Sequence, residues 1–141
     1  MFASALNRIE TSASAVMTQR ARAMRNAGRD VLALSMGQPD FDTPEHIKDA
    51  AKAAMDRGET GYPPLAGTEV LKRAIQEKFK RENSLDYDVD QILVSNGGKQ
   101  IIFNAFAATI NPGDEVIVPA PYWVSYPDIV KYTGGTPVFV E

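Results

Sequence analysis

The fold is decided by the stretch ILVSNGGKQIIFNAFAA at residues 92–108. The apolar run at residues 92–94 predicts a short strand, and the apolar residues after Gln100 predict a helix. Gly97 and Gly98 place a tight turn where this helix begins. Glycines let the backbone approach a ligand closely, and the free N–H groups and dipole of a helix start favour an anion. The stretch therefore predicts a strand–turn–helix unit that can hold a phosphate, with a plain tight turn as the alternative.

The same alternation continues to the end of the sequence. Residues 115–118 and 136–140 predict two further strands, separated by a helix at about residues 124–132. Strand–helix–strand–helix–strand is typical of an α/β fold with a parallel sheet and right-handed crossovers. The helix after Gly98 is predicted to be well buried, because apolar residues cover most of its surface: Ile101, Ile102, Phe103, Ala105, Phe106 and Ile110.

The first 90 residues predict helices joined by irregular segments. Capping residues, a proline at a first helical position and terminal glycines indicate the boundaries. An apolar run at residues 31–34 predicts a strand or an extended segment. The predicted helices are capped by Ser14, Thr43 and Thr68 and end near Asn26, Gly58 and Asn83.

The composition excludes several classes of function. Fifteen basic and 18 acidic residues give a net charge of −3, which does not favour a nucleic-acid or anionic-membrane partner. The sequence has no cysteine and one histidine, His46, so thiolate chemistry and histidine-rich metal sites are excluded. We expect no metal site and assign no role to His46. No apolar stretch approaches the ~20 residues of a membrane span, and we expect a cytoplasmic protein.

Two turns follow predicted strands and are candidates for a ligand site. In parallel sheets, ligands bind at the carboxyl ends of the strands. Residues 95–99 and 119–123 occupy these positions, and neighbouring strands lie about 4.8 Å apart, so we expect the two turns to flank one crevice. Trp123, the only tryptophan, could stack on a ring-shaped cofactor there or pack in the core. Residues 93–100 do not form a nucleotide-binding P-loop, and a dinucleotide fingerprint is absent.

Five ordered motifs give the sequence a specific resemblance. Taken together, they resemble the amino-terminal third of class I pyridoxal-phosphate (PLP) aminotransferases of the aspartate type, including bacterial members that use prephenate. The motifs are GQPDF at residues 37–41 with Thr43 and Pro44, GYPP at 61–64 with Gly67, GGKQ at 97–100, NPGDEV at 111–116, and PAPYWVSY at 119–126.

The resemblance implies cofactor-binding and substrate-binding roles. Gly97, Gly98 and Lys99 would hold the phosphate of pyridoxal 5′-phosphate, and Trp123 would stack on its pyridine ring and touch the substrate. Gly37 would approach the substrate carboxylate through its backbone. Tyr62 would reach the cofactor phosphate of the partner subunit in a homodimer. By themselves these residues also permit plainer roles, with Gly37 as a turn glycine, Tyr62 as a packing residue and Lys99 as a solvated side chain.

The resemblance also implies the organisation of the chain. Residues 1–42 would form an N-terminal helical segment belonging to the small domain and an active-site strand and loop. Residues 43–141 would begin the PLP-binding large domain of the fold-type I transferases, a mostly parallel sheet with covering helices. The lysine that joins the cofactor, the acid at the pyridine nitrogen and the substrate-binding arginine would all lie downstream, so we expect no catalytic residue in residues 1–141.

Two hypotheses about function follow. The first is that the parent protein exchanges an amino group between an amino acid, aspartate by resemblance, and a 2-oxo acid, while residues 1–141 alone are inactive and marginally stable because their sheet keeps an open edge. The second is a non-catalytic module that binds a phosphate ester or pairs with a separate subunit.

Overall fold

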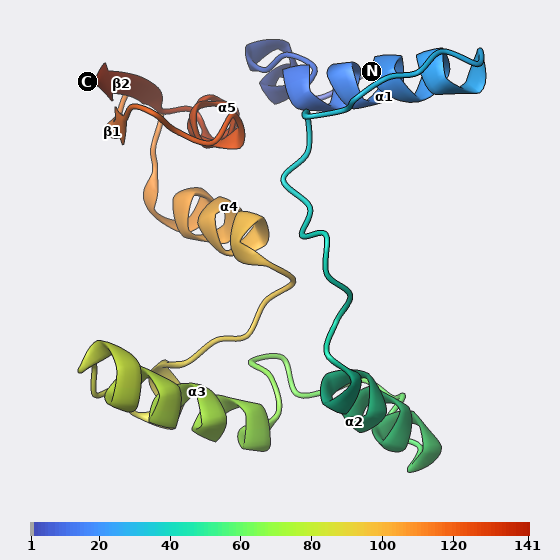
Figure 1. Ribbon diagram of the computed structural model, residues 1–141. Helices are drawn as coiled ribbons and strands as arrows, with labels where there is room; N and C mark the ends of the chain where they lie inside the picture. The colour runs from blue at the N-terminus through green and yellow to red at the C-terminus, as the bar shows by residue number, and fades with distance from the viewer. Residues whose placement is uncertain (1) are drawn as a thin grey trace. The chain divides into compact units, whose positions relative to one another are not determined.

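The computed structural model describes residues 2–141 and contains two compact units. One unit holds Met1–Gln38 and Gly97–Glu141, and the other holds Pro39–Asn96. We call them the sheet unit and the helical unit, and each is described by itself. Figure 1 gives the order of the elements along the chain. Among the described residues, no helix combines the length and apolar character needed to cross a membrane.

A parallel strand pair organises the sheet unit. Strand β1 (Glu115–Pro119) leads through helix α5 (Ser125–Thr133) into strand β2 (Thr136–Val140). The strands pair in register from Glu115 opposite Thr136 to Pro119 opposite Val140. A parallel pair needs a crossover between its strands, and α5 provides it. The predictions for residues 115–118, 124–132 and 136–140 are confirmed.

The core of the sheet unit lies where α5 packs against the strands. Val130 is completely buried in the middle of α5, and Ile129 and Val118 are nearly so. A short 3₁₀ helix, η1 (Ser4–Arg8), packs on the same helix. The Arg8 guanidinium donates from Nη1 to the carbonyl oxygens of Lys131 and Tyr132 at 3.3 and 3.2 Å. A cation at this end stabilises α5, because the last carbonyls of a helix lack intrahelical donors and carry its negative pole.

Helix α4 (Gly98–Thr109) differs from its prediction in burial. It forms after the glycine pair as expected, but none of its residues is buried, and Ile101 is 49% exposed. Among the described elements α4 packs only against α5, so one side of the helix is covered and the rest is open. The prediction of a well-buried helix is therefore wrong for residues 2–141.

The predicted strand at residues 92–94 does not form either. The 3₁₀ helix η2 (Val89–Gln91) precedes an irregular segment there. A strand needs a neighbour that supplies a ladder of hydrogen bonds, but the Val94 N–H donates to the carbonyl of Ala66 in a loop, at 3.0 Å. Of this apolar run, Ile92 is buried in the helical unit, whereas Leu93 is exposed. The described sheet consequently has two strands instead of three.

The N-terminal helix holds the extended segment that follows it. Helix α1 spans Ala13–Asn26, so its cap is Ser12, while the predicted cap Ser14 lies inside the helix. Residues 31–34 are extended without pairing as a strand. Two hydrogen bonds tie this segment to α1: Thr18 Oγ1 to Ser35 Oγ at 3.0 Å, and Arg25 Nε to the Val31 carbonyl at 3.0 Å.

The helical unit contains α2 (Glu45–Asp56) and α3 (Glu69–Asn83). The cap of α2 is Pro44, one residue later than predicted. The cap of α3 is Thr68 as predicted, and its hydroxyl accepts from the Leu71 N–H at 3.4 Å. Satisfying one of the otherwise unpaired amides at the helix start stabilises this boundary.

A close backbone approach joins the loop before α3 to residues 92–94. Gly67 has a φ of 100°, and a Cβ atom there would lie 2.6 Å from Val94 Cγ2. The neighbouring Ala66 carbonyl accepts the Val94 N–H. Only glycine fits this crossing, because any side chain would overlap Val94 and would also strain a positive φ.

Replacing Gly67 by alanine tests this crossing. We expect Gly67→Ala to lower the free energy of unfolding by about 1–2 kcal/mol for the positive φ and by about 1–3 kcal/mol more for the overlap with Val94. Gly58→Ala is the matched control, because Gly58 has a φ of 79° and a Cβ atom there would meet nothing within 4 Å. Urea unfolding measures both variants, and equal losses of stability would contradict the close approach.

Candidate functional site

The start of α4 has the geometry of an anion site. Gly97 is the N-cap with a φ of 84°, and its carbonyl accepts from the N–H groups of Gln100 and Ile101 at 3.2 and 3.3 Å. The N–H groups of Gly98 and Lys99 come too early in the helix to have an intrahelical acceptor. They stand at the positive end of the helix dipole, where an anion is stabilised.

The surroundings of this helix start leave room for a ligand. A Cβ atom at Gly97 or Gly98 would meet nothing within 4 Å. Lys99 is exposed and forms no ion pair with the described residues. Within the part of the chain that the structure describes, a free ammonium, open space and unpaired amides together fit a phosphate group. The chemistry of these donors therefore suits the phosphate of pyridoxal phosphate, the group implied by the sequence resemblance.

Trp123 lies in the turn that follows β1. Its backbone carbonyl accepts the Tyr126 N–H at 3.0 Å, which joins the turn to the start of α5. The residue is 51% exposed, so the indole is not packed in a core formed by the described residues. An exposed indole held in a turn is available to a flat ligand ring.

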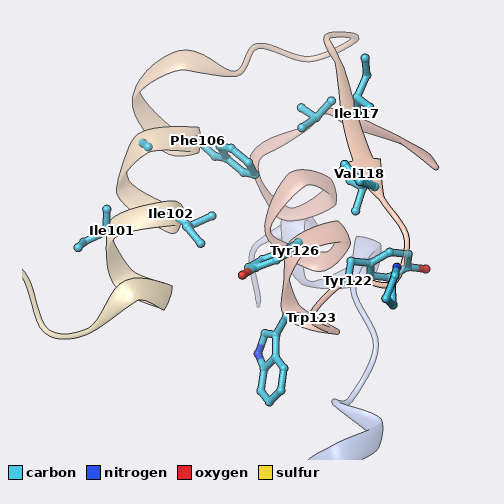
Figure 2. Close-up of a pocket in the computed structure, with 12 residues that line it drawn as sticks. Ile101, Ile102, Phe106, Ile117, Val118, Tyr122, Trp123 and Tyr126 are labelled. Atoms are coloured by element: carbon cyan, nitrogen blue, oxygen red, sulfur yellow. The ribbon is translucent and has the colours of Figure 1, made fainter. Parts of the chain in front are cut away.

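One cavity of the sheet unit connects α4 to this turn. Figure 2 shows Ile102 and Phe106 pointing from α4 toward α5 and β1, with Trp123 and Tyr126 on another side of the cavity. The cavity measures about 560 Å³. Its lining is mostly apolar and consists of Ile101, Ile102, Ala105, Phe106, Val116, Ile117, Val118, Pro119, Pro121, Tyr122, Trp123 and Tyr126.

This cavity corrects the predicted crevice. Residues 95–99 and 119–123 were expected to follow two neighbouring strands, but residues 92–94 form no strand. Helix α4 connects the turn at residues 95–99 to Trp123 instead. The helix begins at Gly98 and supplies one wall of the cavity that Trp123 lines. Tyr126 was not predicted as a lining residue, although its spacing of three from Trp123 at a helix start was a signal for it.

Gly37 and Tyr62 lie in different settings. Gly37 is exposed in the sheet unit, without a positive φ and with nothing within 4 Å of a Cβ position, so local packing does not require glycine there. Tyr62 belongs to the helical unit and is fully exposed. It lines a surface pocket of that unit together with Arg57, Glu59, Gly61, Pro63, Thr68, Val70, Leu71 and Ala74. Both residues present accessible groups, in line with a ligand role.

An ion pair lies beside Tyr62 in this pocket. Arg57 Nε donates to Glu59 Oε1 at 2.8 Å, and both side chains are well exposed. The hydrogen bond from Arg57, and then its charge, lower the pKa of the Glu59 carboxyl below the ordinary value. The same contacts raise the pKa of Arg57. Among the described residues no cluster of acidic or histidine side chains could hold a metal ion.

Comparison with known proteins assigns the family. The profile of the family "Aminotransferase class I and II" matches residues 29–141. The chain belongs to this aminotransferase family. A "probable aspartate/prephenate aminotransferase" of Rhizobium leguminosarum bv. phaseoli is 57% identical over 99% of the chain, and an "aspartate/prephenate aminotransferase" of Cereibacter sphaeroides is 58% identical over 96%. The chain spans 35% and 34% of the lengths of these relatives.

Solved aminotransferases confirm the predicted fold class. The aspartate aminotransferase of Rhizobium meliloti matches 99% of the chain with a TM-score of 0.92 and 52% identity. The Thermus thermophilus aspartate aminotransferase with maleate matches 99% of the chain with a TM-score of 0.95 and 46% identity. The chain covers 35% and 37% of these structures. The helices and small parallel sheet of this aminotransferase chain are the N-terminal third of the fold-type I architecture, as the sequence predicted.

The ion pair in the Tyr62 pocket predicts a shifted titration. We expect NMR titration to place the Glu59 pKa below its ordinary value, and Arg57→Gln to return it toward that value. Because the folded-state pKa is lowered, the stabilisation is present at neutral pH and is lost as the pH falls through the folded pKa. Glu82 is the internal control, since its lowered pKa depends on Arg81 and Lys78. A Glu59 titration unaffected by Arg57→Gln would contradict the pairing.

Proposed function

We propose that this chain is the cofactor-binding N-terminal part of a cytoplasmic, PLP-dependent aminotransferase. The parent protein exchanges an amino group between an amino acid and a 2-oxo acid. One observation carries the proposal: in a chain of the aminotransferase family, the start of α4 offers unpaired N–H groups and Lys99 to a phosphate, and the same helix lines a cavity with Trp123. A phosphate site and an exposed flat indole in one compact unit suit the two ends of pyridoxal phosphate.

Aspartate is the proposed amino donor. The relatives from Rhizobium leguminosarum and Cereibacter sphaeroides are named for aspartate and prephenate, and the solved structures from Rhizobium meliloti and Thermus thermophilus for aspartate. Identities of 46–58% over nearly the whole chain support a shared substrate class. We propose aspartate as donor and a 2-oxo acid, with prephenate as a candidate, as acceptor.

The residues of this chain bind and orient the cofactor. Gly97 turns the backbone so that the N–H groups of Gly98 and Lys99 face one phosphate, and the Lys99 ammonium adds a positive charge. Trp123 would offer its indole face to the pyridine ring. When bound, pyridoxal phosphate supplies an electron-withdrawing ring and an aldehyde carbon that carries the amino group between substrates.

The remaining roles concern the substrate and the second subunit. Gly37, which has no side chain to obstruct approach, contacts the substrate carboxylate through its backbone. In a homodimer, Tyr62 of the partner subunit donates its hydroxyl to the cofactor phosphate, a role that its full exposure permits. Trp123 would also contact the substrate, because its exposed indole stands in the turn that would receive the cofactor ring.

The organisation of the parent protein completes the proposal. Residues 1–42 contribute to the small domain and to an active-site strand and loop, and residues 43–141 begin the large domain. The relatives are about three times as long as this chain. We place the lysine that joins the cofactor in the part of the parent protein beyond the matched third, so residues 1–141 alone are inactive.

Activity of the complete protein tests the proposal. With pyridoxal phosphate, aspartate and a 2-oxo acid such as 2-oxoglutarate, we expect formation of oxaloacetate and the new amino acid, followed by coupled absorbance assay. Isolated residues 1–141 should show no turnover under the same conditions. Binding of pyridoxal phosphate without turnover by the complete protein would contradict the aminotransferase proposal and favour a phosphate-ester-binding module.

The site assignment is tested by affinity for the cofactor. We expect Lys99→Ala to raise the Kd of the cofactor-free protein for pyridoxal phosphate by about 10-fold or more, because a charge-assisted hydrogen bond of about 1.5–3 kcal/mol is lost. The matched control is Lys80→Ala, which removes an exposed lysine that pairs with Asp86 on the helical unit. Equal affinities of the two variants would contradict the role of Lys99.

A further inference from the structure

The turn that carries Trp123 is fixed on both sides of the tryptophan. Before it, the Ala120 N–H donates to the Val140 carbonyl at 2.8 Å and so extends the strand ladder one residue beyond Pro119. After it, the Tyr126 N–H holds the Trp123 carbonyl. These two bonds hold the backbone of the turn at Ala120 and at Trp123.

An aromatic stack fixes the residue directly before Trp123. The rings of Tyr122 and Phe139 lie with centroids 5.0 Å apart and an angle of 25° between their planes, which is a stacked pair. Phe139 belongs to β2, opposite Val118 of β1 in the strand register. The stack therefore joins the Trp123 turn to the far strand of the sheet, across 17 positions of sequence. Aromatic pairs at this separation stabilise an arrangement beyond the area they bury.

Trp123 has no comparable anchor for its own ring. Within residues 2–141 its indole takes part in no aromatic pair, while Tyr122 and Phe139 pair with each other. The direction in which the indole leaves the turn is therefore set by the backbone, and the backbone at Tyr122 is held by the stack. Figure 2 shows Tyr122 directed toward the strand side and Trp123 directed away from it.

We propose that Phe139, acting through Tyr122, is a positioning residue for Trp123. The stack holds the turn so that the indole stands at the cavity with one face free for the flat ring of the cofactor. The inference rests on the proposed function of Trp123 and adds a residue from β2 that none of the five sequence motifs contains. Phe139 does not touch the cofactor; its contribution passes through Tyr122 and the backbone of the turn.

The test uses the complete protein labelled with 5-fluorotryptophan. Phe139→Leu keeps an apolar side chain but removes the stack, whereas Phe139→Tyr keeps the stack. The matched control is Phe103→Leu, which alters another phenylalanine–tyrosine pair of the same unit, with Tyr132 at 5.6 Å, away from the turn. The readouts are the ¹⁹F signal of Trp123, assigned by its loss in Trp123→Phe, the Kd for pyridoxal phosphate and the midpoint of thermal unfolding.

We expect Phe139→Leu to shift or broaden the Trp123 signal in the cofactor-free protein and to raise the Kd by about 3- to 10-fold. Phe139→Tyr should change the Kd less than about 2-fold, and Phe103→Leu should leave both the signal and the Kd unchanged. If Phe139→Leu fails to fold, Tyr122→Leu breaks the same stack from the other side and should give the same pattern.

The outcomes separate the inference from the proposed function. If Trp123→Ala weakens cofactor binding but Phe139→Leu behaves like Phe103→Leu, positioning by Phe139 is overturned while the role of Trp123 stands. If Trp123→Ala leaves the Kd unchanged, stacking of Trp123 on the cofactor is overturned, and the positioning role falls with it. A Trp123 signal that moves equally in Phe139→Leu and Phe103→Leu would also overturn the inference.

Discussion

The parallel pairing of β1 with β2 is the constraint on which the sheet unit depends. Its hydrogen bonds run beyond the strands at both ends, from the Thr136 N–H to the Asp114 carbonyl and from the Ala120 N–H to the Val140 carbonyl, each at 2.8 Å. Because the strands are parallel, a crossover helix must return the chain, and α5 packs Val130 into the core. The turn between β1 and α5 is consequently held at both ends, and this turn carries Trp123.

The candidate site combines this turn with the electrostatics of a helix start. The positive φ of Gly97 brings the backbone into α4 with its first N–H groups exposed, and the exposed Lys99 adds a positive charge at the same place. These groups favour an anion without distinguishing one phosphate from another. The cavity formed by α4, β1 and the Trp123 turn adds an apolar surface beside them. We propose that the helix start binds a phosphate and that the surface at Trp123 receives a flat ring. Both lie in one compact unit, which suits a ligand that has both groups.

Local sequence rules predicted the elements that depend on local interactions. Thr68 caps α3 through its own hydroxyl, and α5, β1 and β2 follow from short apolar runs bounded by prolines and glycines.

The wrong predictions concern contacts between distant residues. Residues 92–94 look like a strand, but a strand exists only with a neighbour, and Val94 bonds to a loop carbonyl instead. The sequence pattern of α4 shows that its surface is apolar. It does not show whether another element covers that surface. The glycine turn could be predicted because its backbone geometry is local. The exposure of Trp123, for which the sequence left ring stacking and core packing open, and the stack of Tyr122 on Phe139 could not.

The central claim is that the amides at the start of α4 bind the cofactor phosphate. Amide ¹H–¹⁵N shifts of the complete, cofactor-free protein test it most directly, with pyridoxal phosphate, inorganic phosphate and pyridoxal added in separate titrations. The account predicts that the Gly98 and Lys99 amides shift with both phosphate-containing ligands and much less with pyridoxal, because the phosphate accepts their hydrogen bonds. Amides that stay unchanged with pyridoxal phosphate, or that shift equally with pyridoxal, would contradict it.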